Sequence, residues 1–206
     1  MGSPDNGVLQ DGECLEESGV GFMQLYRELN HIYATRPMLS MLRKTAAVME
    51  EKYPNRDRLQ IEDLSAKNGG DVKGHNSHEN GLDVDLGYFK ADGIEHDPRT
   101  AGTYYAKPMA VNGVVSSNFD VERNWELVKT LHRFGNVQKI FMDQALKNRL
   151  CAYAKSTNDF QANQKVLLSI RHVTNHADHM HVRLRCPPDA KQCRNLPEPP
   201  TGSGCP

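Results

Sequence analysis

The stretch over residues 74–89 constrains the fold of this chain more than any other, because a strand pattern coincides there with a cluster of metal-ligand side chains. From Leu82 to Leu86, apolar residues alternate with Asp83 and Asp85. That two-residue period is typical of a half-buried strand. We therefore expect the apolar residues to face the core and the two carboxylates to share the other face.

His78 lies seven residues before Asp85. On one continuous strand, this odd separation would put the two side chains on opposite faces. The pair Asn80-Gly81 between them is typical of a turn. We therefore expect a turn there to fold His78 back over the strand, beside Asp85.

A second window, near the C-terminus, repeats this pattern. From His179 to Arg185, polar and apolar residues alternate again, so His179 and His181 are expected to point to one side of a strand, with His176 in the loop before it. Five of the nine histidines in the chain lie in these two windows. Because random scatter would rarely cluster them in this way, we expect both windows to converge on one metal ion.

Two imidazoles and one carboxylate, here His78, Asp85 and His181, form a reasonable ligand set for zinc (Zn²⁺). Three protein ligands leave a coordination position for water, whose pKa zinc lowers to about 7. His179, on the same face as His181, is then placed to act as a general base or to stabilise a developing oxyanion. His176, in the preceding loop, is a candidate for a similar role in proton transfer or oxyanion stabilisation.

Simpler interpretations exist for each window alone. A single histidine is more often a surface or hydrogen-bonded residue than a ligand, and Asp83 and Asp85 also fit the solvated face of an edge strand. A non-haem Fe(II) oxygenase uses two histidines and a carboxylate as well. Its usual first pair is the tighter His-x-Asp, whereas six residues separate His78 from Asp85 here.

The two windows also carry a resemblance to a known family. Their motifs are His75-x-x-His78-x6-Asp85 and His176-x-x-His179-x-His181-Val-Arg-Leu-Arg-Cys-Pro. Together they resemble the penicillin-insensitive murein endopeptidases, a branch of the zinc peptidases that also includes D-Ala-D-Ala dipeptidases. The resemblance extends to Cys205, although little of it is recognisable between about residues 90 and 135.

The resemblance implies a role for each candidate site residue. It implies that His78, Asp85 and His181 hold zinc, and that His179 and His176 act in catalysis. It also makes His75, which the spacing argument does not require, an active-site residue and a candidate further ligand. We find no counterpart here of a metal contact from the middle region of the family.

The five cysteines bear on the compartment. Cys186 and Cys193 bracket a short Pro-containing loop, while Cys151 and Cys205 are placed to tie the C-terminal tail to a helix. Disulfides persist in exported proteins, so this arrangement favours export, and five reduced thiols are the alternative. The resemblance implies the same two pairings, and it implies that Cys14 lacks a partner that lies beyond the end of this chain.

No leader sequence is recognisable at the start of the chain. Met1-Gly2-Ser3 looks like the remnant of an expression tag, so we expect that a native signal peptide has been removed and that the protein is periplasmic or otherwise exported. The formal charge of −1 gives no electrostatic argument for nucleic acid or an anionic membrane as the main partner. No apolar run approaches about 18 residues, so we expect no transmembrane segment.

The remaining pattern predicts one mixed domain, for which 206 residues and 38% hydrophobic composition suffice. Residues 1–20 are expected to be a loose segment before a zinc metallopeptidase domain over 21–206. Helices are expected over 37–52, 121–134 (with Asp120 as its cap) and 144–154, and strands over 59–64, 82–86, 137–142, 164–172 and 179–185. The irregular order of helices and strands predicts the α+β class, with a small, mostly antiparallel sheet flanked by helices and disulfide-tied loops.

Residues 90–118 are expected to form a long irregular stretch. We interpret His96 within it as a solvated surface residue. Tyr104, Tyr105 and Lys107 are candidates for lining a substrate groove, because loops often carry binding residues.

These observations lead to two hypotheses about function. The first is a zinc-dependent murein endopeptidase that hydrolyses peptide cross-links in bacterial peptidoglycan. The D-alanyl-diaminopimelate type of cross-link comes from the resemblance alone. The second is a non-catalytic cell-wall-binding module that keeps zinc for structure, although structural zinc sites are usually closed by four Cys or His ligands.

Overall fold

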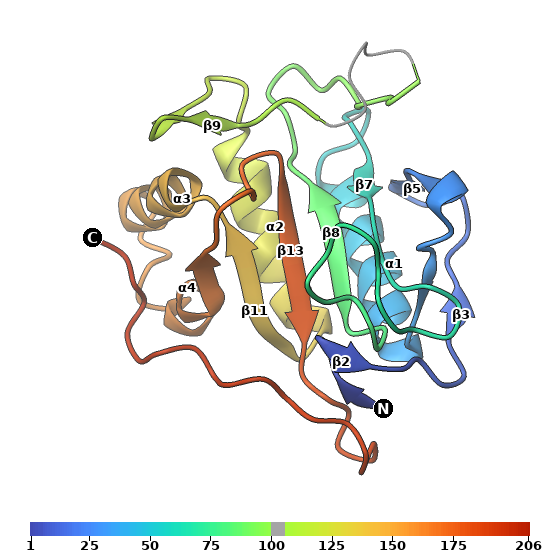
Figure 1. Cartoon of the computed structure of the whole chain (residues 1–206). Helices are drawn as coiled ribbons and strands as arrows, with labels where there is room; N and C mark the ends of the chain where they lie inside the picture. Colours follow the sequence, from blue (N-terminus) through green and yellow to red (C-terminus); the bar gives the residue numbers. More distant parts are fainter. Residues whose placement is uncertain (100–105) are drawn as a thin grey trace.

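The structure is a computed structural model, and it describes residues 1–99 and 106–206. Its centre is a seven-stranded, mostly antiparallel sheet (Figure 1). Across the sheet the strands are β12 (Ile170–His172), β11 (Val137–Met142), β13 (His179–Leu184), β8 (Asp83–Gly87), β7 (Leu59–Ile61), β5 (Phe22–Gln24) and β4 (Ser18–Gly19). The predicted α+β class is confirmed.

The two predicted site strands are neighbours in the middle of this sheet. β8 pairs antiparallel with β13, and the register places His181 opposite Asp85 and Arg183 opposite Asp83. Directly opposite residues on one face of an antiparallel pair have neighbouring side chains. Two segments about a hundred residues apart in the sequence therefore present their polar side chains side by side.

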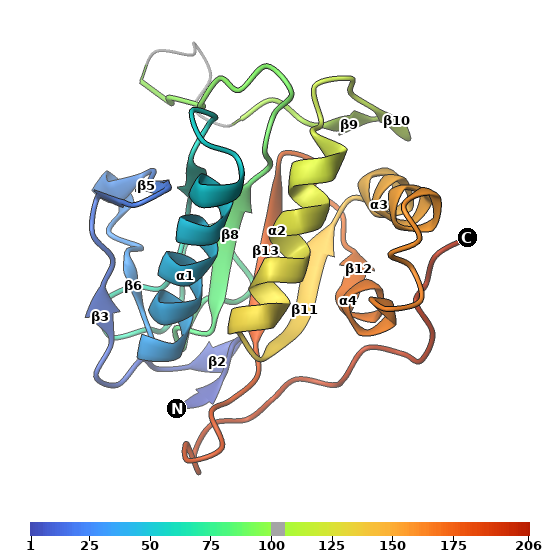
Figure 2. The same ribbon diagram turned by 180° about the vertical axis from the view of Figure 1, so that it is seen from behind.

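Two helices cover the other face of the sheet, as Figure 2 shows from behind. α1 (Arg36–Lys52) begins with Pro37 in its first turn, and α2 (Val121–Phe134) begins after Asp120, whose side chain accepts a hydrogen bond from the Arg123 N–H. Proline and aspartate suit these starting positions because the first helical N–H groups have no partner in the helix. Both predicted helices are confirmed. The apolar residues that alternate with the site residues, such as Val84 and Val182, are fully buried in the core.

The prediction of a strand over residues 164–172 is wrong in its first part. Residues Gln164–Ser169 form the short helix α4, and only Ile170–His172 form the strand β12. Val166, Leu167 and Ile170 are buried, a spacing that fits one face of a helix. Over so short a segment, helical and strand periods are hard to distinguish, and packing beside β11 decides between them.

The N-terminal segment also differs from the expected loose chain. β1 (Gly2–Ser3) pairs with β2 (Asn6–Gly7), and the amide of Gly2 donates to the carbonyl of Gln192. Leu15 is fully buried in the same core as the rest of the chain. Backbone pairing with a distant segment anchors these residues, and composition alone does not reveal such pairing.

Three smaller features complete the fold. β3 (Glu13–Cys14) pairs with β6 (Tyr33–Ala34), a 3₁₀ turn spans Arg27–Leu29, and β9 (Ala110–Val111) pairs with β10 (Val114–Val115). α3 (Gln144–Ser156) confirms the third predicted helix. No helix within residues 1–99 and 106–206 has the length and apolar character needed to cross a membrane.

Both predicted disulfides are present. Cys151 in α3 is bonded to Cys205 in the tail, and Cys186 is bonded to Cys193 across the short loop after β13. Cys14 is exposed and is in no disulfide with the described residues. The first bond holds the irregular C-terminal tail against the helical layer.

Candidate active site

Three of the predicted ligands bring their donor atoms together. His78 Nε2 lies 3.1 Å from His181 Nδ1 and 3.4 Å from Asp85 Oδ2, and His181 Nδ1 lies 3.1 Å from Asp85 Oδ1. All three side chains are buried. Two imidazoles and a carboxylate this close together have the composition of a zinc site.

A tight turn places His78 where the sequence predicts it. His78 and Gly81 have positive φ angles of 73° and 76°, which fold the chain back onto β8. The backbone N–H of His78 donates to Asp83, and its ring Nδ1–H donates to the carbonyl of Leu64. A carbonyl can only accept, so Nε2 of His78 keeps its lone pair for the centre of the site.

His181 is braced from behind by a buried ion pair. Arg183 donates two hydrogen bonds to Asp83, at 2.8 and 3.0 Å, and Asp83 Oδ1 also lies 3.2 Å from His181 Nε2. A carboxylate behind an imidazole fixes the ring orientation of many metal-binding histidines. Asp83 therefore directs His181 Nδ1 toward Asp85 and His78.

The electrostatics of this trio favour a cation at its centre. Burial alone would raise the pKa of the Asp85 carboxyl, but the adjacent His78 and His181 imidazoles hold it well below its usual range. Burial alone would likewise lower the pKa of His181, but Asp83 and Asp85 raise it to about 9. Asp85 Oδ1, which faces His181 Nδ1 at 3.1 Å, is buried without a hydrogen bond of good geometry. A metal ion fits this donor set, because it would replace the proton and satisfy the carboxylate.

His75 stands beside the trio and is itself held by a carboxylate. Its Nε2 lies 3.0 Å from Asp63, which also contacts His31 at 3.1 Å, and its Nδ1 lies 3.5 Å from Asp85. The donor atoms of His75, His78 and Asp85 all lie within 4.8 Å of one another. With Nε2 bonded to Asp63, only Nδ1 of His75 remains free for a metal.

His179 faces the same centre but has a different partner. Asp178 accepts a hydrogen bond from its Nδ1 at 2.8 Å, and its Nε2 lies 4.0 Å from Asp85 Oδ1. Burial alone would lower the pKa of His179, but Asp178, Asp85 and Glu62 raise it to about 9. A histidine oriented by a carboxylate at one nitrogen can exchange a proton at the other.

His176 completes the group from the loop before β13. Its Nδ1–H donates to the carbonyl of Thr174, and its ring centroid lies 4.9 Å from that of His179. Burial lowers the pKa of His176, so the two neighbouring imidazoles are shifted in opposite directions. Groups with opposite shifts are typical of acid–base sites.

These side chains open onto a cleft of about 740 Å³. Phe141 and Glu62 line it together with the candidate site residues, namely His75, Asp85, His176, His179 and His181. Burial raises the pKa of Glu62, and the charges of nearby carboxylates raise it further. The charge of His179 lowers it, and the net result is a pKa of about 8. The cleft therefore joins a buried polar centre to solvent.

Sequence reasoning missed the carboxylates that orient the histidines. In the strand predicted over residues 59–64, Asp63 would share a face with Leu59 and Ile61, and an acidic residue on an otherwise apolar face is a signal that could have found it. Asp178 adjoins His179 in the sequence but lies outside the alternating pattern. Their roles depend on which histidine nitrogen they contact, which spacing does not specify.

Two further predictions concern the loop after β8. His96 is not solvated but only 8% exposed, because its backbone pairs with the side chain of Gln60. Tyr104 and Tyr105 lie outside the described residues. Lys107 lines a second, smaller pocket next to the cleft.

Comparison with known proteins shows which family the chain belongs to. A sequence model of the family described as "Penicillin-insensitive murein endopeptidase" matches residues 1–206. The chain belongs to this family. The penicillin-insensitive murein endopeptidase of Pectobacterium atrosepticum is 29% identical over 212 residues, covering 100% of this chain and 71% of the relative. That of Haemophilus influenzae is 28% identical, covering 100% and 70%, and that of Escherichia coli strain K12 is 34% identical over 154 residues, covering 70% and 52%.

Proposed function

We propose that this protein is a zinc-dependent murein endopeptidase that hydrolyses D-alanyl-diaminopimelate cross-links in bacterial peptidoglycan. The observation that carries the proposal is the convergence of His78, Asp85 and His181 to 3.1–3.4 Å beside a histidine oriented by a carboxylate. Membership of the family supports the substrate class.

In this proposal His78, Asp85 and His181 hold the zinc, with His75 Nδ1 as a further candidate ligand. When bound, zinc supplies a Lewis acid that polarises the scissile carbonyl and makes water nucleophilic near neutral pH. His179 exchanges a proton through Nε2, because Asp178 occupies its Nδ1. It delivers this proton to the leaving amine, while the uncharged imidazole of His176 lies beside it to contact the substrate.

The alternative is a cell-wall-binding module in which zinc is only structural. A structural site needs no acid–base group, yet the Asp178–His179 pair faces an open cleft. A structural site also needs a fourth protein ligand, for which His75 Nδ1 is the candidate. The catalytic interpretation accounts for more of the site.

We also propose that the protein is exported, in a periplasmic or similarly oxidising compartment. Two disulfides support this, since disulfide bonds persist there and are rare in the cytosol. Export would place the enzyme with its substrate.

Digestion of purified cross-linked peptidoglycan tests the proposed activity. We expect mass spectrometry of the released muropeptides to show loss of cross-linked dimers, blocked by a chelator and restored by zinc. Intact dimers in the presence of fully zinc-loaded protein would overturn the proposal and favour the binding module.

A further inference from the structure

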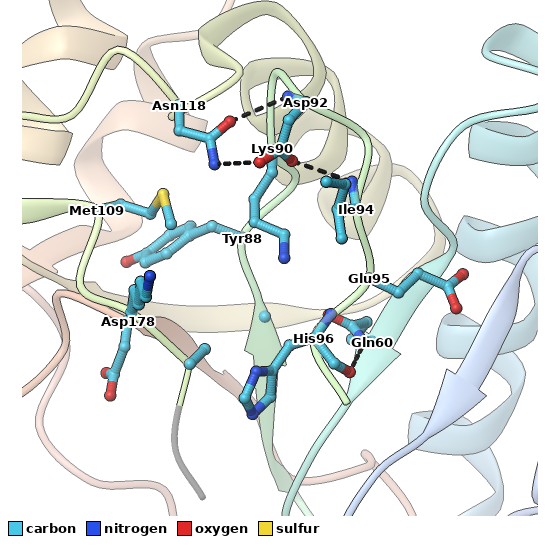
Figure 3. A pocket seen from close by; sticks show the side chains of 13 residues that line it. Gln60, Tyr88, Lys90, Asp92, Ile94, Glu95, His96, Met109, Asn118 and Asp178 are labelled. Atoms are coloured by element: carbon cyan, nitrogen blue, oxygen red, sulfur yellow. Dashed lines mark hydrogen bonds between the residues drawn. The ribbon is translucent and has the colours of Figure 1, made fainter. Parts of the chain in front are cut away.

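A second pocket of about 260 Å³ adjoins the catalytic cleft at the C-terminal end of β8 (Figure 3). Tyr88 and Met109 form apolar parts of its wall, and the loop after β8 forms the rest. Ala106 and Asp178 line both this pocket and the cleft. A ligand in the cleft can therefore extend past Asp178 into the pocket. We call it the Lys90 pocket, after the residue discussed below.

The wall of the Lys90 pocket is fixed by side chains that bond loop backbone. Gln60 on β7 donates to the carbonyl of His96 at 2.7 Å and accepts from its N–H at 2.9 Å. Asn118 likewise accepts from the N–H of Asp92 at 3.0 Å and donates to its carboxylate at 2.8 Å. Such reciprocal pairs hold the loop at Asp92 and His96, so this part of the pocket wall is preformed.

The three acidic residues that line the pocket already have partners. Glu95 forms a bidentate pair with Arg58, with both N–O distances 2.7 Å. Asp92 accepts from the side chain of Asn118 and from the N–H of Ile94 at 3.0 Å. Asp178 is bonded to His179. Arg58 and His179 therefore offset the charges of Glu95 and Asp178, whereas the donors to Asp92, the Asn118 amide and the Ile94 N–H, are neutral.

Lys90 places a positive charge among the residues that line the pocket. Its backbone is held on both sides, because its N–H donates to Asp57 at 3.1 Å and its carbonyl accepts from Arg56 at 3.3 Å. Figure 3 shows its side chain directed into the pocket. Within residues 1–99 and 106–206, the ammonium of Lys90 is in no ion pair. The half-buried cation is thus held in place without an ion pair among these residues, while its charge acts at longer range on the carboxylates of Asp92 and Glu95.

We propose that the Lys90 pocket is a substrate subsite in which the Lys90 ammonium binds a carboxylate of the cross-linked peptide. This inference rests on the proposed endopeptidase function and names the group that the site recognises. Lys107, exposed at the edge of the pocket, adds to its positive charge.

The position of the pocket indicates which carboxylate is bound. The Lys90 pocket lies beyond Asp178, the partner of the histidine that delivers a proton to the leaving amine. The carboxylate therefore belongs to the amine side of the scissile bond. In a D-alanyl-diaminopimelate cross-link, the carbon that carries the acylated amine also carries a free carboxylate. This carboxylate lies on the amine side of the scissile bond.

A pair of synthetic cross-linked peptides tests the inference. One carries the free carboxylate next to the scissile amide nitrogen, and the other carries a primary amide there. For the zinc-loaded wild type we expect kcat/KM to be roughly tenfold higher with the carboxylate, as for one hydrogen bond to a charged group. Lys90→Met should lose this preference through a higher KM, with kcat unchanged, and Lys90→Arg should retain most of it.

Lys44→Met is the matched control, because Lys44 is an exposed lysine on α1, on the other face of the sheet. It should keep the full preference. The amidated peptide is an internal check on folding, since Lys90→Met should hydrolyse it as fast as the wild type does. A tenfold preference that persists in Lys90→Met, or a wild type that hydrolyses both peptides equally well, would overturn the inference alone. A zinc-loaded wild type that hydrolyses neither peptide would instead overturn the proposed endopeptidase function.

Discussion

The centre of the cleft and the Lys90 pocket at its rim hold their functional side chains by different means. At the centre, His181 and Asp85 lie opposite each other on two buried strands, and their positions follow from the register of the sheet. At the rim, Gln60 and Asn118 fix an irregular loop by bonding its backbone. The centre of the cleft is thus part of the protein core, whereas the loop at its rim is held to the core by side-chain hydrogen bonds.

Because of this difference, we expect mutations at the centre and mutations at the rim to have different effects. A change at the centre removes a ligand or leaves a buried charge without its partner, so we expect loss of metal, activity or stability. A change at the rim alters only the fit of the substrate. The proposed function and subsite would therefore place chemistry on the rigid strands and selectivity on the loop, where side chains can vary with little cost to the fold.

The largest effect should come from removing a central imidazole. We expect His78→Ala to lower kcat/KM for a cross-linked muropeptide by at least about 10³-fold, because one of three ligands is lost. His172→Ala is the matched control, since His172 is exposed on β12. Hydrolysis assays at saturating zinc check this, and an active His78→Ala enzyme would remove the distinction between centre and rim.

A smaller effect is expected where the centre acts through acid–base chemistry. Asp178→Asn should lower kcat about 10²-fold without loss of zinc, because His179 loses the carboxylate that orients it and contributes to its raised pKa. The measurements are kcat, zinc content and the NMR titration of His179 in zinc-free protein, which should shift to a lower pKa. Asp189→Asn, at an exposed position, is the control. Unchanged kcat would show that Asp178 has no part in the reaction.

The buried Asp83–Arg183 pair behind the centre should contribute to the free energy of unfolding. Asp83→Asn breaks the buried pair with Arg183, and we expect the zinc-free protein to lose about 3 kcal/mol of unfolding free energy. Burial alone would raise the pKa of Asp83, but His181 and Arg183 lower it. Its contribution is therefore fully present above the ordinary aspartate pKa and is lost as pH falls toward the folded-state value.

Urea denaturation at neutral and acidic pH measures this contribution. The difference in stability between the wild type and Asp83→Asn should shrink as the pH is lowered. Glu51→Gln, an exposed change on α1, should have little effect. A stability difference that grows at low pH would contradict the assigned direction.

The smallest effect is expected at the rim. Asn118→Ala removes the pair that holds Asp92, and we expect KM to rise about threefold with kcat and stability nearly unchanged, as for one weakened hydrogen bond. Asn148→Ala, on α3, is the control. Steady-state kinetics with the carboxylate peptide decides this, and a loss of kcat of about 10²-fold would place the rim within the catalytic machinery.

The same comparison explains what could be predicted from the sequence. Alternation from Leu82 to Leu86 and from His179 to Arg185 sufficed for both site strands and for the face that carries the histidines, because strand geometry is local. The turn at Asn80-Gly81 was predictable for the same reason.

What could not be predicted depends on contacts between distant segments. The burial of His96 comes from Gln60, and the orientation of His75 comes from Asp63, which lies just after β7. The short helix α4 has too few residues for its period to be recognised. In each case tertiary packing, which a local pattern does not encode, decides the outcome.

The central claim is that the β8–β13 register builds a zinc site whose ligands are distinct from its acid–base group. Zinc content after dialysis, measured by elemental mass spectrometry on wild type, His179→Ala and His181→Ala, tests it most directly. We expect one zinc per chain in the wild type and in His179→Ala, and none in His181→Ala. A full zinc complement in His181→Ala, or its loss in His179→Ala, would contradict the claim.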